Sequence, residues 1–209
     1  MKIFFFTFTL CLLAVSLGAT PIVYGTGTPL SGSTQLSGFG NWSGNAVLHW
    51  SIVPVVGDIW SYSYTFTHEG SDLSHIVLEF TAGCGADPLC ITDDSTGTAD
   101  GPRTYEAFQP PNFEQPVDIY GVKFDFSGGS PYTFSFTSDR APVWGNMYAR
   151  DGTNAYAYNA GLLDQLSGNT ADFVARPDGA PNPIPEPQSL VLIGGGLLIL
   201  FWSRRKRKL

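Results

Sequence analysis

The chain has 209 residues, with 11 basic and 18 acidic side chains and a formal net charge of −7. Seventeen of the acids but only five of the bases lie within residues 20–183, so this segment has a net charge of −12. That charge opposes binding to nucleic acid or to an anionic membrane surface, and about 164 residues suffice for one domain with its own core.

The N-terminus has the layout of a secretory signal peptide. Met1-Lys2 is basic, Ile3 to Leu17 is almost uninterrupted apolar sequence, and the small residues Gly18 and Ala19 follow. This order predicts a signal peptide over residues 1–19, handled by the secretion machinery and cut after Gly18 or Ala19. A buried N-terminal helix is the alternative interpretation.

Residues 20–175 predict a β-rich ectodomain. Aromatic and hydroxyl residues alternate in 60–67 and again in 132–137, which is the period of a strand with one buried and one exposed face. Further strands are expected at 46–53, 74–81, 117–126 and 143–149. Residues 20–44 are expected to form a weakly ordered lead-in or an edge strand, and 160–166 one or two helical turns. The expected fold class is all-β: an antiparallel β-sandwich, jelly-roll-like, with turn residues between short strands.

Two cysteines, Cys84 and Cys90, lie in this segment and bracket a loop-forming stretch. In an oxidising compartment such a pair predicts a disulfide that stiffens its own loop. A metal site would require more ligands nearby than the sequence offers here.

The densest internal motif runs from Asp139 to Gly145. Arg140 and Trp144 are candidate ligand-stacking residues, because a guanidinium and an indole together can clamp a sugar. The alternative is structural: Arg140 and Asp139 brace a turn while Trp144 fills the core.

Other candidate chemistry is weaker, and we expect no catalytic residue, metal site or cofactor. The histidines at 49, 68 and 75 match no compact ligand spacing, although the last two could meet across a hairpin. Aspartates 87, 93, 94 and 100 could supply oxygens to calcium but do not follow a calcium-loop pattern. A glycoside hydrolase would require two facing carboxylates, which the sequence alone does not place.

The C-terminal residues form a linker and a short tail. Residues 176–183 hold three prolines and are expected to be an extended linker. In the tail at 184–209, Pro185-Glu186-Pro187 precedes an apolar run at 190–202, and a basic stop follows: Arg204, Arg205, Lys206, Arg207 and Lys208. Thirteen helical residues span roughly 20 Å, so we expect a single short transmembrane helix whose basic end stays in the cytoplasm.

The order and spacing of this tail resemble the PEP-CTERM sorting signal, a tail that is also labelled ice-binding protein C-terminal domain. The resemblance covers residues 184–209 and implies export in a Gram-negative bacterium, with processing by the membrane protease exosortase. The resemblance also implies at least transient anchoring in the inner membrane, followed by delivery to the cell surface or extracellular matrix. A permanent single-span anchor is the alternative.

A second resemblance rests on residues 73–79, 120–125 and 134–152. These segments are similar to a β-rich ectodomain found among PEP-CTERM proteins, which implies a fold and a location but carries no catalytic residue.

The sequence therefore predicts an exported, non-catalytic envelope or matrix protein associated with exopolysaccharide or biofilm. The first alternative is a carbohydrate-binding or adhesion module, suggested by four tryptophans that could stack on sugars: Trp42, Trp50, Trp60 and Trp144. A glycoside hydrolase is the second alternative.

Overall fold

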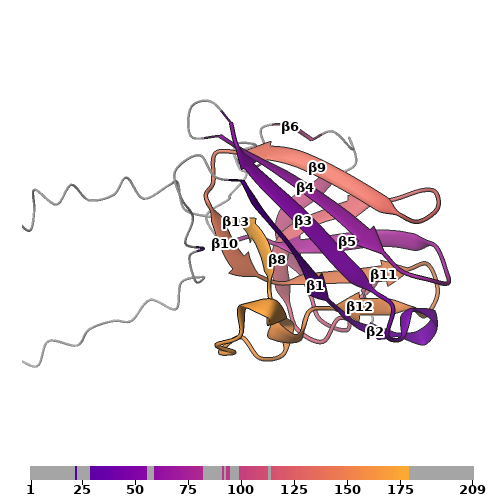
Figure 1. The fold of residues 1–209 in the computed structure, drawn as a ribbon. Coiled ribbons are helices and arrows are strands. Elements are labelled where there is room, and N and C mark those ends of the chain that lie inside the picture. The colour runs from indigo at the N-terminus through magenta and orange to yellow at the C-terminus, as the bar shows by residue number, and fades with distance from the viewer. Residues whose placement is uncertain are drawn as a thin grey trace, which may run out of the picture.

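The computed structural model describes residue 22 and residues 29–55, 59–81, 91, 93–94, 99–112 and 114–178. Two antiparallel sheets lie face to face in a sandwich-like arrangement (Figure 1). This confirms the predicted antiparallel, mostly β architecture, and no α-helix occurs among these residues.

The first sheet has five strands in the order β1-β3-β4-β9-β6. Their bounds are Leu30–Gln35, Val47–Pro54, Trp60–Thr67, Tyr132–Ser138 and Asp93–Asp94, respectively. β4 begins and ends where the alternating pattern predicted, and β9 does so to within one residue. Their aromatic side chains are buried while the intervening serines and threonines face outward, as a half-buried strand requires.

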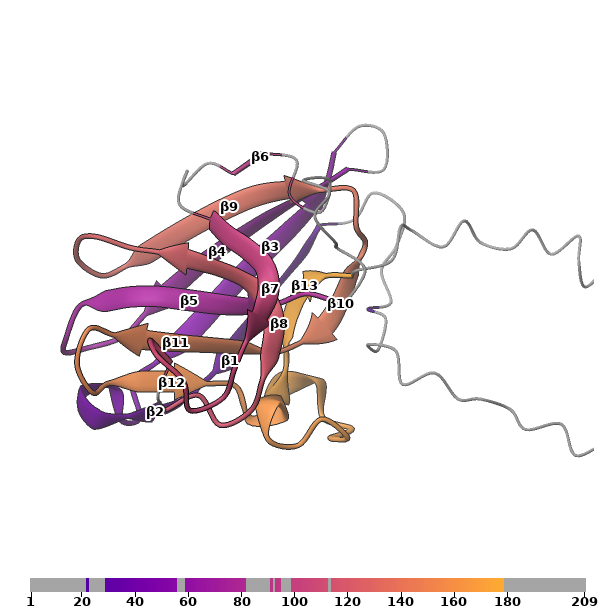
Figure 2. The same cartoon turned by 180° about the vertical axis from the view of Figure 1, so that it is seen from behind.

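The second sheet has six strands in the order β2-β12-β11-β5-β8-β7 and forms the rear layer, which faces the viewer in Figure 2. Their bounds are Ser37–Phe39, Tyr156–Tyr158, Met147–Asp151, Leu73–Glu79, Ile119–Asp125 and Ala99–Tyr105. The expected lead-in at 20–44 thus contains two edge strands, because β1 borders one sheet and β2 borders the other.

Aromatic rings from both sheets form the core. Phe124 of the second sheet stacks on Phe136 of the first at 5.6 Å between ring centroids, and contacts Phe134 at 4.6 Å. Offset stacking of this kind adds to the free energy gained by burying the rings. Trp42, Trp50 and Trp60 are also buried, so three of the four tryptophans that could stack on sugars belong to the core instead.

The predicted strand at 143–149 is wrong as a single element. The chain leaves β10 (Pro142–Gly145), passes through Asn146 and enters β11, and these two strands belong to different sheets. Asn146 makes this change of direction possible, because its backbone and side-chain amides are both held by the Glu79 carboxylate.

β10 pairs with β13 (Val174–Pro177) in a small two-stranded sheet that closes one end of the sandwich. Arg176 and Pro177, which we expected to begin the linker, are therefore buried in a strand. Of the one or two helical turns predicted at 160–166, the structure has one, a 3-10 turn at Ala160–Leu162, and a second 3-10 turn follows at Thr170–Asp172.

Candidate functional site

A groove of about 530 Å³ opens where the two-stranded sheet meets the end of the six-stranded sheet. β5 and β8 supply one wall, and β10 and β13 supply the other. The segment that carries the two 3-10 turns forms the outer lip. Four chain segments far apart in the sequence thus converge on this site, at 79–81, 118–120, 144–146 and 162–176.

A polar network forms the floor of the groove, centred on Glu79. Its Oε1 accepts a hydrogen bond from Arg176 Nη2 at 2.9 Å, and Oε2 accepts two from the backbone N and Nδ2 of Asn146, at 2.8 and 2.7 Å. Arg176 Nη1 donates to Thr81 Oγ1 at 2.8 Å and to the Pro177 carbonyl at 2.9 Å. Since these partners are fixed by strands, the floor is rigid and its charges are paired.

The walls combine aromatic and polar side chains. Trp144 is half-buried and packs edge-to-face against Trp50 at 5.8 Å, and Tyr120 is also half-buried. Leu166 is 83% exposed on the lip. The exposed residues Asp118, Gln165 and Thr170 add hydrogen-bonding groups at the rim. Such a concave apolar surface with a few polar groups is typical of small-ligand sites.

Trp144, but not Arg140, lies in this groove. Arg140 is buried elsewhere: its Nε pairs with Asp139 Oδ1 at 2.9 Å and its carbonyl accepts a hydrogen bond from Tyr62 Oη at 2.7 Å. The guanidinium on the floor belongs to Arg176 instead. The three prolines of residues 176–183 indicate a linker at Arg176, although an arginine two residues after the apolar Phe173-Val174 pair is compatible with a strand.

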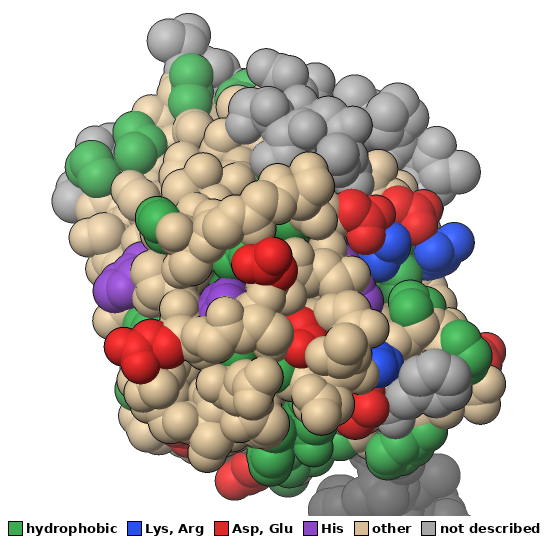
Figure 3. Space-filling view, turned by 90° about the vertical axis from the view of Figure 1, so that its right-hand side faces the viewer, with side chains coloured by type: hydrophobic (Ala, Val, Ile, Leu, Met, Phe, Trp, Pro, Cys, Tyr) green, Lys and Arg blue, Asp and Glu red, His purple; other side chains and the backbone are tan. Residues whose placement is uncertain are grey.

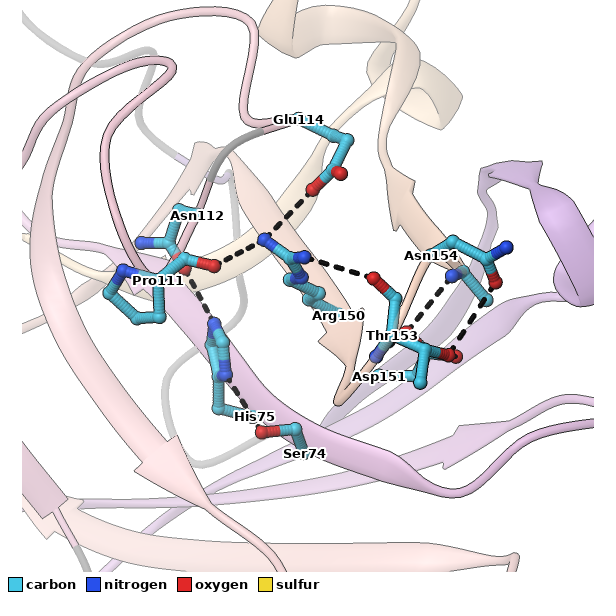
Figure 4. Close-up of polar contacts among 10 residues, drawn as sticks. Ser74, His75, Pro111, Asn112, Glu114, Arg150, Asp151, Thr153 and Asn154 are labelled. Atoms are coloured by element: carbon cyan, nitrogen blue, oxygen red, sulfur yellow. Dashed lines mark hydrogen bonds and ion pairs between the residues drawn. The ribbon is translucent and has the colours of Figure 1, made fainter.

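A second polar cluster lies on the outer side of the six-stranded sheet, around Arg150 (Figure 4). Arg150 Nη1 contacts Glu114 Oε2 at 2.8 Å and donates to the Pro111 carbonyl, while Nη2 donates to the Thr153 carbonyl at 3.1 Å. His75 Nε2 meets Asn112 Oδ1 at 2.6 Å beside it. These contacts fasten the segment between β7 and β8 onto the sheet, which is a structural role.

Asp151 braces the turn that follows Arg150. Its carboxylate accepts hydrogen bonds from Ser71 Oγ, the Thr153 backbone N and Oγ1, and the Ala155 backbone N, at 2.6 to 2.9 Å. Burial acts to raise the pKa of Asp151, but these four bonds outweigh it and the pKa is lowered.

The histidines do not assemble a metal site. His49 is exposed on β3, whereas His68 stacks on Tyr132 at 5.5 Å and lies 4.6 Å from the Trp42 ring. His75 sits in the other sheet. No group of three or more potential metal ligands occurs within the described ranges. Of the acidic stretch, Asp100 is ion-paired with Arg103 at 2.6 Å.

Burial of His68 and His75 predicts that the protein loses stability in mild acid. Desolvation lowers the pKa of both side chains below 6.5 in the folded state, so the unfolded chain takes up protons first as the pH falls. We expect the free energy of unfolding to be flat above about pH 7 and to fall below pH 6.5. The slope should reach at most about 1.4 kcal/mol per pH unit for each histidine.

Urea denaturation at pH 7.5, 6.5 and 5.5 measures this dependence. His75→Gln should make the slope shallower, and the exposed His49→Gln serves as the matched control with an unchanged slope. A free energy of unfolding that is constant from pH 7.5 to 5.5 would show that neither buried histidine has a lowered pKa.

Several sequence predictions fall outside the described residues. These are the signal peptide at 1–19, the Cys84–Cys90 disulfide, most of the linker, and the tail with Pro185, Glu186, Pro187 and the basic stop. Among the residues that are described, no helix is long and apolar enough to cross a membrane.

Comparison with known proteins identifies the tail. Residues 183–206 match the family model of the PEP-CTERM protein-sorting motif. The resemblance stated from the sequence is thereby confirmed, and the motif implies an exported protein that is processed by exosortase and sorted to the cell surface. No curated protein and no solved structure matches the chain.

Proposed function

We propose that this chain is an exported, non-catalytic protein of the cell envelope or extracellular matrix that binds extracellular polysaccharide through the Trp144 groove. Its jelly-roll-like sandwich would be delivered by the PEP-CTERM tail to the place where such polymers accumulate. The observation that carries the proposal is the groove itself, in which a half-buried indole stands over a rigid polar floor.

The chemistry of the walls suits a sugar ring. One face of a pyranose is apolar and packs on an indole, while its hydroxyls require donors and acceptors around the edge. Trp144 supplies the aromatic surface, and Asp118, Gln165 and Thr170 supply exposed polar groups at the rim. Tyr120 and Leu166 would exclude water from the bound ring.

The state of Glu79 favours binding over hydrolysis. A glycoside hydrolase requires one carboxyl group that can give up a proton and a second that faces it. Both oxygens of Glu79 already accept hydrogen bonds, from Arg176 and from Asn146. Because this carboxylate already joins β5 to Arg176 and Asn146, its role in the proposal is to hold the floor in place.

Within this proposal, exosortase processes the tail, and the sandwich binds polysaccharide of the matrix. Association with exopolysaccharide or biofilm would follow from the groove, while release or retention at the surface would follow from the tail. Adhesion to a foreign glycan uses the same site chemistry and remains the alternative.

We expect Trp144→Ala to weaken binding of polysaccharide from the producing cells at least tenfold, which corresponds to about 1.4 kcal/mol. Affinity gel electrophoresis of the full-length protein in that polysaccharide measures the effect. Tyr156→Ala is the matched control, because Tyr156 is also half-buried but lies outside the groove. Equal retardation of Trp144→Ala and wild type would refute the groove as the binding site.

A further inference from the structure

Four strands of the five-stranded sheet, β1, β3, β4 and β9, carry an uncharged, hydroxyl-rich outer surface that the groove does not include. Fourteen residues of β1, β3, β4 and β9 point outward, and we call them the hydroxyl face. They are Ser31, Ser33, Gln35, Val47, His49, Ser51, Val53, Ser61, Ser63, Thr65, Thr67, Thr133, Ser135 and Thr137.

The strand register orders these side chains into ranks across the sheet. One rank consists of four serines on four adjacent strands: Ser31, Ser51, Ser63 and Ser135. The next contains Ser33, His49, Thr65 and Thr133. Neighbouring strands lie about 4.8 Å apart and alternate residues along a strand about 6.7 Å apart, so the hydroxyls form a regular two-dimensional array.

None of the fourteen residues of the hydroxyl face is Lys, Arg, Asp or Glu. Charged residues make up 14% of the chain, so about two of the fourteen would be charged at that frequency. The opposite sheet, by contrast, presents ion pairs such as Lys123 with Asp125 and Arg103 with Asp100. In Figure 3 the basic side chains gather on the right of the view, whereas acidic side chains occur on both sides.

We propose that the hydroxyl face docks on the surface of a neutral, hydroxyl-rich polysaccharide, as a second contact area separate from the groove. Each serine or threonine hydroxyl both donates and accepts, as do the hydroxyls of a sugar polymer. Small side chains keep the face flat, so many such bonds can form at once. The proposal shares only the class of ligand with the proposed function, and either can fail without the other.

Charge decides between this partner and others. The segment's net charge of −12 repels an anionic polysaccharide, and an uncharged face offers no compensating cations. A protein partner would require anchors of the Trp, Tyr or Arg type, and the fourteen residues include none. A neutral polymer requires neither charge nor anchor, because affinity comes from many weak contacts along one chain.

The test is adsorption of the full-length protein, in detergent, to two insoluble neutral glucans, cellulose and curdlan, with alginate gel as the anionic comparison. We expect wild type to adsorb to at least one glucan, to persist in 1 M NaCl, and not to adsorb to alginate. Ser33→Glu with Ser63→Glu should reduce adsorption at least tenfold. These two exposed positions are not opposite each other in the register, so the sheet should keep its thermal midpoint.

Ser37→Glu with Thr104→Glu is the matched control, since it adds the same charge to exposed positions of the other sheet. It should adsorb like wild type.

Soluble oligosaccharides from the same glucans probe the groove alone, and the face variant should bind them normally. Three results would overturn the hydroxyl face as a polysaccharide surface: failure to adsorb to either glucan, preference for alginate, or equal adsorption of wild type and face variant. Concentration-dependent dimerisation lost in the face variant would instead assign the face to a second copy.

Discussion

Arg176→Leu should lower the free energy of unfolding by about 3 to 5 kcal/mol, as expected when one member of a buried pair is removed. Arg176 is only 2% exposed and joins Glu79, Thr81 and the Pro177 carbonyl through separate hydrogen bonds. Leucine cannot replace these donors, so the Glu79 carboxylate loses its countercharge. The side chain of Glu79 is 25% exposed, which places the expected loss toward the lower end of this range.

Urea denaturation at pH 7.5 measures this loss. Arg103→Leu is the matched control, because Arg103 pairs with Asp100 at the surface and its loss should cost less than about 0.5 kcal/mol. A double variant, Glu79→Gln with Arg176→Met, removes both charges and should recover part of the stability. Equal effects of Arg176→Leu and Arg103→Leu would mean that the floor network contributes nothing beyond a surface pair.

Trp42→Ala should destabilise the fold by about 3 to 5 kcal/mol, the usual cost of truncating a large buried aromatic residue. The Trp42 side chain is fully buried, contacts Phe66 edge-to-face at 5.4 Å, and donates from Nε1 to the Ser71 carbonyl at 3.0 Å. It therefore joins the short turn Gly40–Trp42 to β4 and to the segment that precedes β5. Alanine would leave a cavity and an unsatisfied carbonyl.

Thermal unfolding monitored by near-UV circular dichroism measures the loss, and Leu166→Ala is the control at an exposed position. The unfolding temperature of Trp42→Phe should lie between those of Trp42→Ala and Leu166→Ala, because phenylalanine keeps an aromatic ring but lacks the indole N–H donor. If Trp42→Ala and Leu166→Ala unfold at the same temperature, Trp42 does not hold the turn against the sandwich.

Strands with clear period-two alternation could be predicted from the sequence. In β4 and β9 every second residue is aromatic, and only an extended strand with one buried face satisfies that pattern. The predicted strands do not include β7, in which Gly101 and Pro102 are residue types typical of turns. In the structure these residues form an irregular stretch of an edge strand, where proline is tolerated.

The candidate site was predicted only in part, for a physical reason. Trp144 could be recognised from its residue type, but on the groove floor Glu79 lies 65 positions earlier and Arg176 lies 32 positions later in the chain. Asn146 and Arg176 meet at Glu79 only after the chain changes sheets between β10 and β11. Local patterns cannot report that change, because the sequence of residues 143–149 is compatible with one uninterrupted strand.

The most direct test of the whole account is to fractionate the producing cells and determine the mass of the native protein in each fraction, before and after enzymatic digestion of the matrix polysaccharide. We expect a protein that ends near Pro185 to Ser189, co-purifies with the extracellular polysaccharide, and is released when that polymer is digested. A protein that retains Leu209, stays in the inner membrane and is unaffected by the digestion would contradict it.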